Sequence, residues 1–99
     1  MRRHVLVTYD IADPTRLRLT HAVVRDFGAM LQYSVYLCRL TGRQRAELNG
    51  RLRAVIHGSE DQVLFIDLGP VRFQDTDSIP VEEVLGRPIK ASFPSTVVF

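Results

Sequence analysis

The chain has 99 residues, 45% of them hydrophobic and 24% charged, a composition typical of one soluble globular domain. It contains no apolar run near the about 20 residues that a membrane helix needs, and the short run after its basic start lacks the cleavage pattern of a signal peptide. The single cysteine excludes an internal disulfide. These features suit a reducing compartment, so we expect a cytoplasmic protein that does not enter a membrane.

Charge is distributed unevenly although the net charge is only +2. Residues 1–57 contain ten Lys/Arg against four Asp/Glu, a balance of +6, whereas residues 58–99 contain three against seven, a balance of −4. Twelve of the thirteen basic residues are arginine, which contacts phosphate in bidentate geometry. The segregation indicates a nucleic-acid-binding face. A codon bias of the genome explains the arginine excess equally well.

The first predicted strand spans residues 4–11 and ends in a phenol and a carboxylate, Tyr9 and Asp10. Val5, Val7 and Tyr9 face one way, while Leu6, Thr8 and Asp10 face the other. Both faces are apolar up to Tyr9, which is typical of a central strand covered on both sides. Its end is either a simple exit into solvent or a site.

A helix follows, with Asp13 suited to its N-cap, Pro14 to its first position and Gly28 to its end. Its predicted core-facing arc consists of Leu17, Leu19, Val23, Val24 and Phe27. Two short strands are then expected at 29–32 and 34–40, joined by a corner at residues 32–34, with Cys38 as a core thiol.

Thr41 and Gln44 fit a capping box that opens a second helix at about 43–57, with Gly58 as its C-cap. A fourth strand is expected at 62–68, and "STVVF" at 95–99 resembles a last short strand. The three histidines, His4, His21 and His57, have no metal-ligand spacing and are expected at the surface.

The order βαββαβ predicts an α+β, ferredoxin-like fold, with both helices on one face of a four-stranded antiparallel sheet. Residues 1–70 would form this core, and residues 71–99 an extension that completes a dimer or docks a partner. Because the other sheet face would be apolar and bare, we expect a homodimer that packs sheet on sheet. The strand at 95–99 could pair with an edge of the second copy.

The chain resembles the CRISPR-associated protein 2 family in "VTYDIADPTRLR", "LQYSVYLC", "LTGRQRAELNGRL", "QVLFIDLG" and the "LGRP…VVF" ending. The resemblance covers nearly the whole chain. It implies a ferredoxin-like homodimer in CRISPR antiviral defence that acts beside the CRISPR integrase in acquiring spacers. Members are described as metal-dependent endonucleases on RNA or DNA, or as scaffolds on duplex DNA. Met30 stands where the family commonly has a basic residue, and Tyr36 where it often has Phe.

The resemblance puts the family's site at Tyr9, Asp10, Arg16 and Arg18, with a divalent metal on Asp10. A two-fold axis near the strand end would bring two Asp10 carboxylates together, and one shared Mg²⁺ or Mn²⁺ would relieve their repulsion. One ion held this way is enough for a weak or conditional nuclease. Asp13 serves as a cap. Tyr9, the second candidate catalytic residue, is better suited to packing or a phosphate hydrogen bond than to proton transfer.

Arginines on both helices are candidate phosphate contacts that would give salt-dependent, sequence-independent affinity: Arg16, Arg18, Arg43, Arg45, Arg51 and Arg53. The alternative is a pair of solvated helix faces. Three functions therefore stay open: an adaptation scaffold bound to DNA and integrase, an Asp10-centred endonuclease, and a non-catalytic regulatory or toxin-type dimer outside CRISPR.

Overall fold

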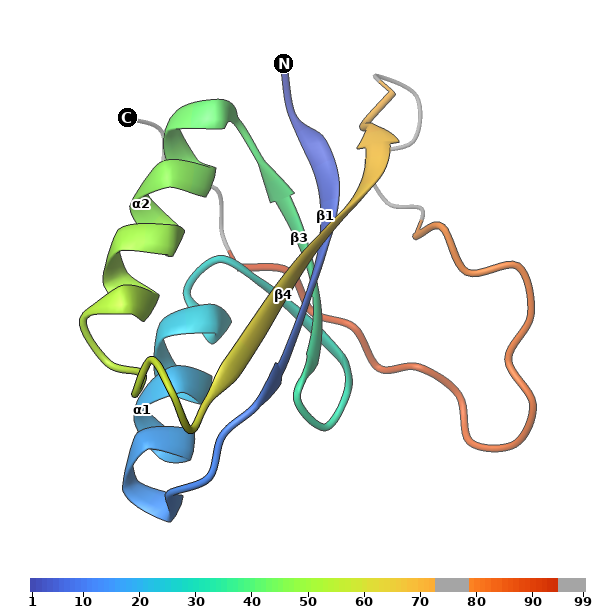
Figure 1. Cartoon of the computed structure of the whole chain (residues 1–99). Helices are drawn as coiled ribbons and strands as arrows, with labels where there is room; N and C mark the ends of the chain where they lie inside the picture. The colour runs from blue at the N-terminus through green and yellow to red at the C-terminus, as the bar shows by residue number, and fades with distance from the viewer. Residues whose placement is uncertain (73–78, 95–99) are drawn as a thin grey trace.

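The structure, a computed structural model, describes residues 1–72 and 79–94. Its strands and helices follow the order β1 (Arg3–Asp10), α1 (Pro14–Arg25), β2 (Gly28–Gln32), β3 (Val35–Leu40), α2 (Gly42–Arg53) and β4 (Gln62–Pro70). The strands form one antiparallel sheet in the order β2-β3-β1-β4, and both helices cover the same face (Figure 1). The predicted βαββαβ architecture is confirmed. Residues 95–99, predicted as a last strand, lie outside the described residues.

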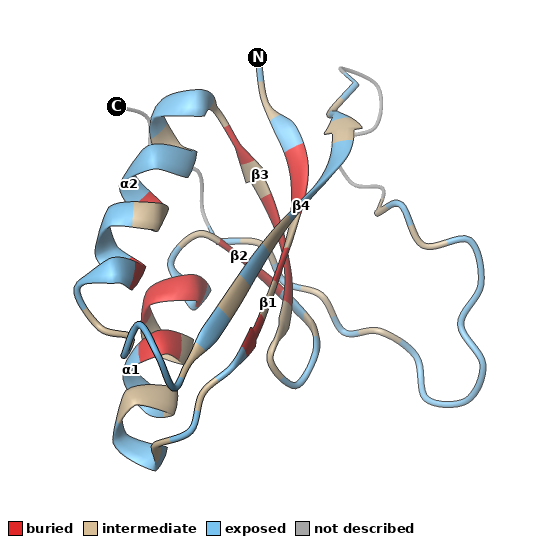
Figure 2. Ribbon diagram, viewed as in Figure 1, coloured by how far each residue is buried: buried red, intermediate tan, exposed pale blue. Residues whose placement is uncertain are grey.

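The core lies between the sheet and the two helices (Figure 2). From β1 it receives Val5, Val7 and Tyr9, whose register partners across the strand pairs include Cys38, Tyr36, Phe65 and Val63. Cys38 is completely buried, as predicted. The alternating residues of the central strands therefore lie on the opposite face, which we call the open face.

Local signals set the helix starts as predicted. The Asp13 side chain accepts a hydrogen bond from Arg16 N at the start of α1, and Pro14 occupies the first turn. At α2 the Thr41 hydroxyl accepts from Gln44 N, and the Gln44 side chain accepts from Thr41 N. Such caps satisfy amides that a helix start leaves unpaired, and each is worth about 1 kcal/mol.

Three predictions about the helices were wrong. Gly28 is the first residue of β2, where a Cβ would lie 2.5 Å from Leu37 O and Cys38 Sγ, so glycine is required for close strand approach. Helix α2 ends at Arg53 with Ala54 as C-cap, because Val55 N turns back to Leu52 O in a tight final turn. Leu19, at the margin of the predicted arc, is 49% exposed, while the neighbouring Thr20 is buried.

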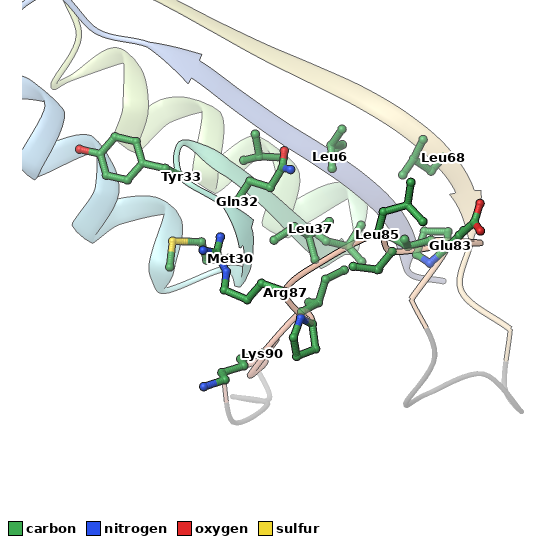
Figure 3. Close-up of a pocket in the computed structure, with 17 residues that line it drawn as sticks. Leu6, Met30, Gln32, Tyr33, Leu37, Leu68, Glu83, Leu85, Arg87 and Lys90 are labelled. Atoms are coloured by element: carbon green, nitrogen blue, oxygen red, sulfur yellow. The ribbon is translucent and has the colours of Figure 1, made fainter.

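Residues 79–94 leave the sheet as a wide loop and return along its open face (Figure 1). The loop and the sheet enclose a cavity of about 840 Å³ lined by Leu6, Leu37, Leu68 and Leu85 among others (Figure 3). The Arg39 guanidinium lies 3.9 Å from the centre of the Phe93 ring and fastens the end of this segment to the sheet. The open face is therefore only partly bare.

Candidate functional site

The end of β1 presents Asp10 and Tyr9 to opposite sides of the sheet. Asp10 is exposed on the open-face side and is paired with Gln62 of β4 in the strand register. Tyr9 is 7% exposed and belongs to the core beneath the helices. The two candidate catalytic residues are adjacent in sequence, but the structure does not bring the phenol and the carboxylate together.

The Tyr9 hydroxyl belongs to a three-residue network centred on His21. It lies 2.9 Å from His21 Nδ1, and the Tyr36 hydroxyl lies 2.9 Å from Nε2 of the same ring. The Tyr36 and His21 rings also meet edge to face, 5.4 Å apart. His21 therefore ties β1, β3 and α1 together, and the prediction that it is a surface residue was wrong.

Burial raises the pKa of Tyr9 far above its ordinary value, and the neighbouring Tyr36 raises it further. A phenol in this position keeps its proton throughout the physiological range. Because the Tyr9 hydroxyl is bonded to His21 and the ring is buried in the core, Tyr9 packs the interior in this structure. A catalytic role for Tyr9 stays a prediction.

Asp61, just before β4, collects hydrogen bonds that no sequence pattern indicates. Its carboxylate accepts from Ala12 N at 2.9 Å, His57 N at 2.7 Å and Arg16 Nε at 2.8 Å. Arg16 Nη2 adds a bond of 3.2 Å to the same carboxylate and one of 3.0 Å to Glu60. The bond from Arg16 is the main reason why the pKa of the Asp61 carboxyl lies well below its usual range.

The ion pairs show that charge segregated in sequence is partly neutralised in space. Arg3 pairs with Asp67, and Arg16 pairs with Glu60 and Asp61, so basic residues of the first half meet acidic residues of the second. The charge split along the chain is therefore in part a record of tertiary pairing.

The remaining candidate arginines differ in how far they are engaged. Arg51 pairs with Asp26 at 3.2 Å and lies over the Phe27 ring. Arg53 donates to Asn49 at 2.7 Å, one turn earlier on α2. Arg18 and Arg43 are exposed. Within residues 1–72 and 79–94, no hydrogen bond or ion pair occupies either of these two side chains.

An apolar row runs along β4 on the open face, and only its Leu68 end lines the cavity beneath residues 79–94. Leu64, Ile66 and Leu68 of this row are 44%, 41% and 44% exposed. Their register partners on β1 include Thr8 for Leu64 and Leu6 for Ile66. Asp10 therefore ends the strand that borders this row.

The donor set for a metal is sparse within one chain. Across the described ranges, no three His, Cys, Asp or Glu residues are grouped in a way that could hold an ion. Asp10 is an exposed carboxylate, and Mg²⁺ accepts one or two carboxylates while retaining several waters. One protomer thus offers a single exposed carboxylate, Asp10, which is at most part of a site for such an ion.

The sequence did not indicate the roles of Asp61 and His21, because their hydrogen-bond partners lie far from them along the chain. Asp61 is 45 residues from Arg16, and His21 is 12 and 15 residues from its two tyrosines. His4 was also predicted at the surface, yet it is 7% exposed on β1. His57 is exposed as expected.

Neither helix in the described part of the chain has the length and apolar character that a membrane-spanning helix needs.

Comparison with known proteins gives consistent matches. Residues 2–76 match the family model for CRISPR associated protein Cas2. The CRISPR-associated endoribonuclease Cas2 1 of Rhodospirillum rubrum is 40% identical over 72 residues, which cover 73% of this chain and 69% of that protein. The CRISPR-associated endoribonuclease Cas2 of Geobacter sulfurreducens is 34% identical over 70 residues, or 71% of this chain and 74% of that protein.

Solved structures agree with the sequence matches. Streptococcus pyogenes Cas2, crystallised at pH 6.5, superposes with a TM-score of 0.64 at 28% identity and covers 84% of this chain and 99% of its own. A hypothetical protein of Thermus thermophilus superposes with a TM-score of 0.72 at 27% identity, covering 93% and 100%. By its family-model match, its curated relatives and its fold, the chain belongs to the Cas2 family of CRISPR-associated proteins.

Proposed function

We propose that this protein acts as a homodimer in CRISPR spacer acquisition, where it binds duplex DNA beside the CRISPR integrase. We further propose that it carries a metal-dependent endonuclease centre at Asp10. The observation that carries the proposal is the exposed position of Asp10 at the end of β1, next to the apolar row of Leu64, Ile66 and Leu68. The same edge thus offers a metal ligand and a surface for a second copy.

The apolar row supports a two-fold dimer. An exposed patch of neighbouring aliphatic side chains favours a partner, and a symmetric pair buries the same patch twice. Residues 79–94 already cover the adjoining part of the open face, so a second copy would complete the layer.

The metal proposal follows from the dimer. Two Asp10 carboxylates near the axis would repel each other, and a divalent cation between them would remove that cost. When bound, Mg²⁺ or Mn²⁺ would activate one water and neutralise one phosphate. Each copy of the chain would supply one carboxylate, that of Asp10, while Tyr9 would pack the strand end from below. With one ion per dimer, cleavage would be slow.

The exposed arginines support contact with nucleic acid. Arg18 on α1 and Arg43 on α2 are exposed, and Arg51 and Arg53 keep their charge at the surface although they pair locally. Such contacts to phosphates give affinity that falls steeply with salt. The family match favours this reading over a regulatory or toxin-type dimer outside CRISPR.

The extension, residues 71–99, would either complete the dimer or dock the integrase. Its described part carries exposed Glu82 and Glu83 beside exposed Arg87 and Lys90 on a wide loop, where these charges are accessible to a partner. Deleting residues 80–99 should abolish co-purification with the integrase. Unchanged co-purification would refute the docking role of this segment.

The catalytic proposal is tested with labelled single-stranded RNA and double-stranded DNA, each with Mg²⁺, Mn²⁺ or chelator. Wild-type protein should cleave slowly, only with metal, and Asp10→Ala should not cleave. Equal cleavage by both proteins would show that the activity comes from a contaminant. Retention of DNA binding without any cleavage would leave the scaffold role and reject the endonuclease.

A further inference from the structure

We propose that Arg16 and Asp61 act as one positioning pair that fixes the end of β1, and that Arg16 is therefore not a phosphate ligand. The inference rests on the proposed function, because it concerns the site at Asp10. The pair joins the first turn of α1 to the loop that precedes β4, and the chain that leaves Asp10 runs directly into this turn.

The Asp61 carboxylate is enclosed and fully used. Its side chain is 0% exposed, and it accepts hydrogen bonds from two backbone amides, Ala12 N and His57 N, besides the Arg16 guanidinium. A buried carboxylate is stable only when its oxygens are paired and hydrogen-bonded. Arg16, whose side chain is 24% exposed, supplies the balancing charge.

Asp61 holds the backbone on both sides of Asp10. Ala12 lies two residues after Asp10, and its amide is held by Asp61. On the other side Gln62, which follows Asp61 directly, is the register partner of Asp10. One carboxylate thus fixes both the strand beside Asp10 and the chain that leaves it. A ligand held on both sides is preorganised, and loss of such support commonly weakens metal binding about 10- to 100-fold.

The geometry also argues against phosphate binding by Arg16. Its Nε and Nη2 both donate to Asp61, and Nη2 donates to Glu60 as well. Turning the guanidinium toward a phosphate would leave the enclosed Asp61 carboxylate without its counter-charge, which is costly. Arg18, two residues along α1 and exposed, can contact a phosphate without that cost.

The test uses the full chain and four variants: Arg16→Ala, Asp61→Asn, their double mutant, and Arg16→Lys. The matched control is Arg3→Ala, which breaks another Arg–Asp pair of 2.8 Å at the opposite end of β1. The first readout is hydrogen exchange of the Ala12 and His57 amides. Both should exchange about tenfold faster or more in the Arg16 and Asp61 variants and stay unchanged in the control.

The second readout is Mn²⁺ affinity, measured from the electron paramagnetic resonance signal of the free ion. Arg16→Ala and Asp61→Asn should each raise the Kd about 10- to 100-fold, and the double mutant should be no worse than either alone. Arg16→Lys should not restore affinity, because lysine lacks the planar fork that spans Asp61. A role limited to global stability would lower the melting temperature and leave the Kd unchanged.

The third readout is the salt dependence of binding to a short DNA duplex. Arg16→Ala should leave the negative slope of log K against log [KCl] unchanged, whereas loss of one phosphate contact makes this slope less steep by about 0.9. A less steep slope in Arg16→Ala, with normal amide exchange, would overturn the positioning pair. If wild type binds no Mn²⁺, the proposed metal centre fails, while exchange and slope still decide the role of Arg16.

Discussion

Replacing Ile66 by glutamate should dissociate the proposed dimer, because this residue lies in the middle of the exposed apolar row on β4. Ile66 is 41% exposed, and full burial of such a side chain is worth about 1.5–3 kcal/mol. Completing its burial in both protomers is then worth about 1–2.5 kcal/mol, or a factor of about 5 to 60 in Kd. Ile66→Ala should weaken the dimer by up to this factor.

Glutamate adds a larger penalty, since each copy would place an unpaired carboxylate in an apolar interface at a cost of several kcal/mol. Light scattering and sedimentation at micromolar concentration should show dimers for wild type and monomers for Ile66→Glu. The matched control is Leu19→Glu, a leucine 49% exposed on the helical layer, which should remain dimeric. A monomeric wild type, a dimeric Ile66→Glu or an equal effect of Leu19→Glu would refute sheet-to-sheet dimerisation.

Three further predictions concern the interior and its titration. His21→Ala removes the hydrogen-bond partner of the part-buried Tyr9 and Tyr36 hydroxyls, so the free energy of unfolding should fall by about 1–3 kcal/mol. The measurement is urea titration at fixed protein concentration, and a change below about 1 kcal/mol would show that water replaces the ring. Burial raises the pKa of Cys38 to about 12, so native protein at pH 8 should react with a thiol reagent only after unfolding, and rapid native reaction would contradict its burial. The pKa of Asp61 is lowered in the folded state, so its contribution to stability is complete above its unfolded value near 3.8 and is lost as the pH falls below that value. Asp61→Asn should therefore reduce the loss of stability between about pH 4 and lower pH, and an unchanged loss would count against the pairing.

Sequence patterns predicted the element order and the helix starts well, because these depend on neighbours in the chain. The Asp13 and Thr41 caps and the strand alternation are local signals, and the structure contains them. The ends of both helices were placed too late. At Gly28 the deciding contact is with Leu37 and Cys38 on another strand, which local sequence does not reveal.

In the candidate site, too, local sequence predicts some features, whereas others depend on contacts between distant residues. The position of Asp10 at an exposed strand end follows from alternation along β1. The partner of Arg16 could not be predicted, because Asp61 lies 45 residues away and neither residue stands in a recognisable pattern. The His21 network likewise depends on how α1 packs over β1 and β3, so its ring was taken for a surface group.

The number of divalent ions bound per chain is the most direct test of the proposed shared metal site. Titration of the full-length protein with Mn²⁺, followed calorimetrically, should give one ion for every two chains. Asp10→Asn, which keeps the side-chain shape but removes the charge, should bind none at the same concentrations. One ion per chain, or undiminished binding by Asp10→Asn, would contradict a single metal shared by two Asp10 residues.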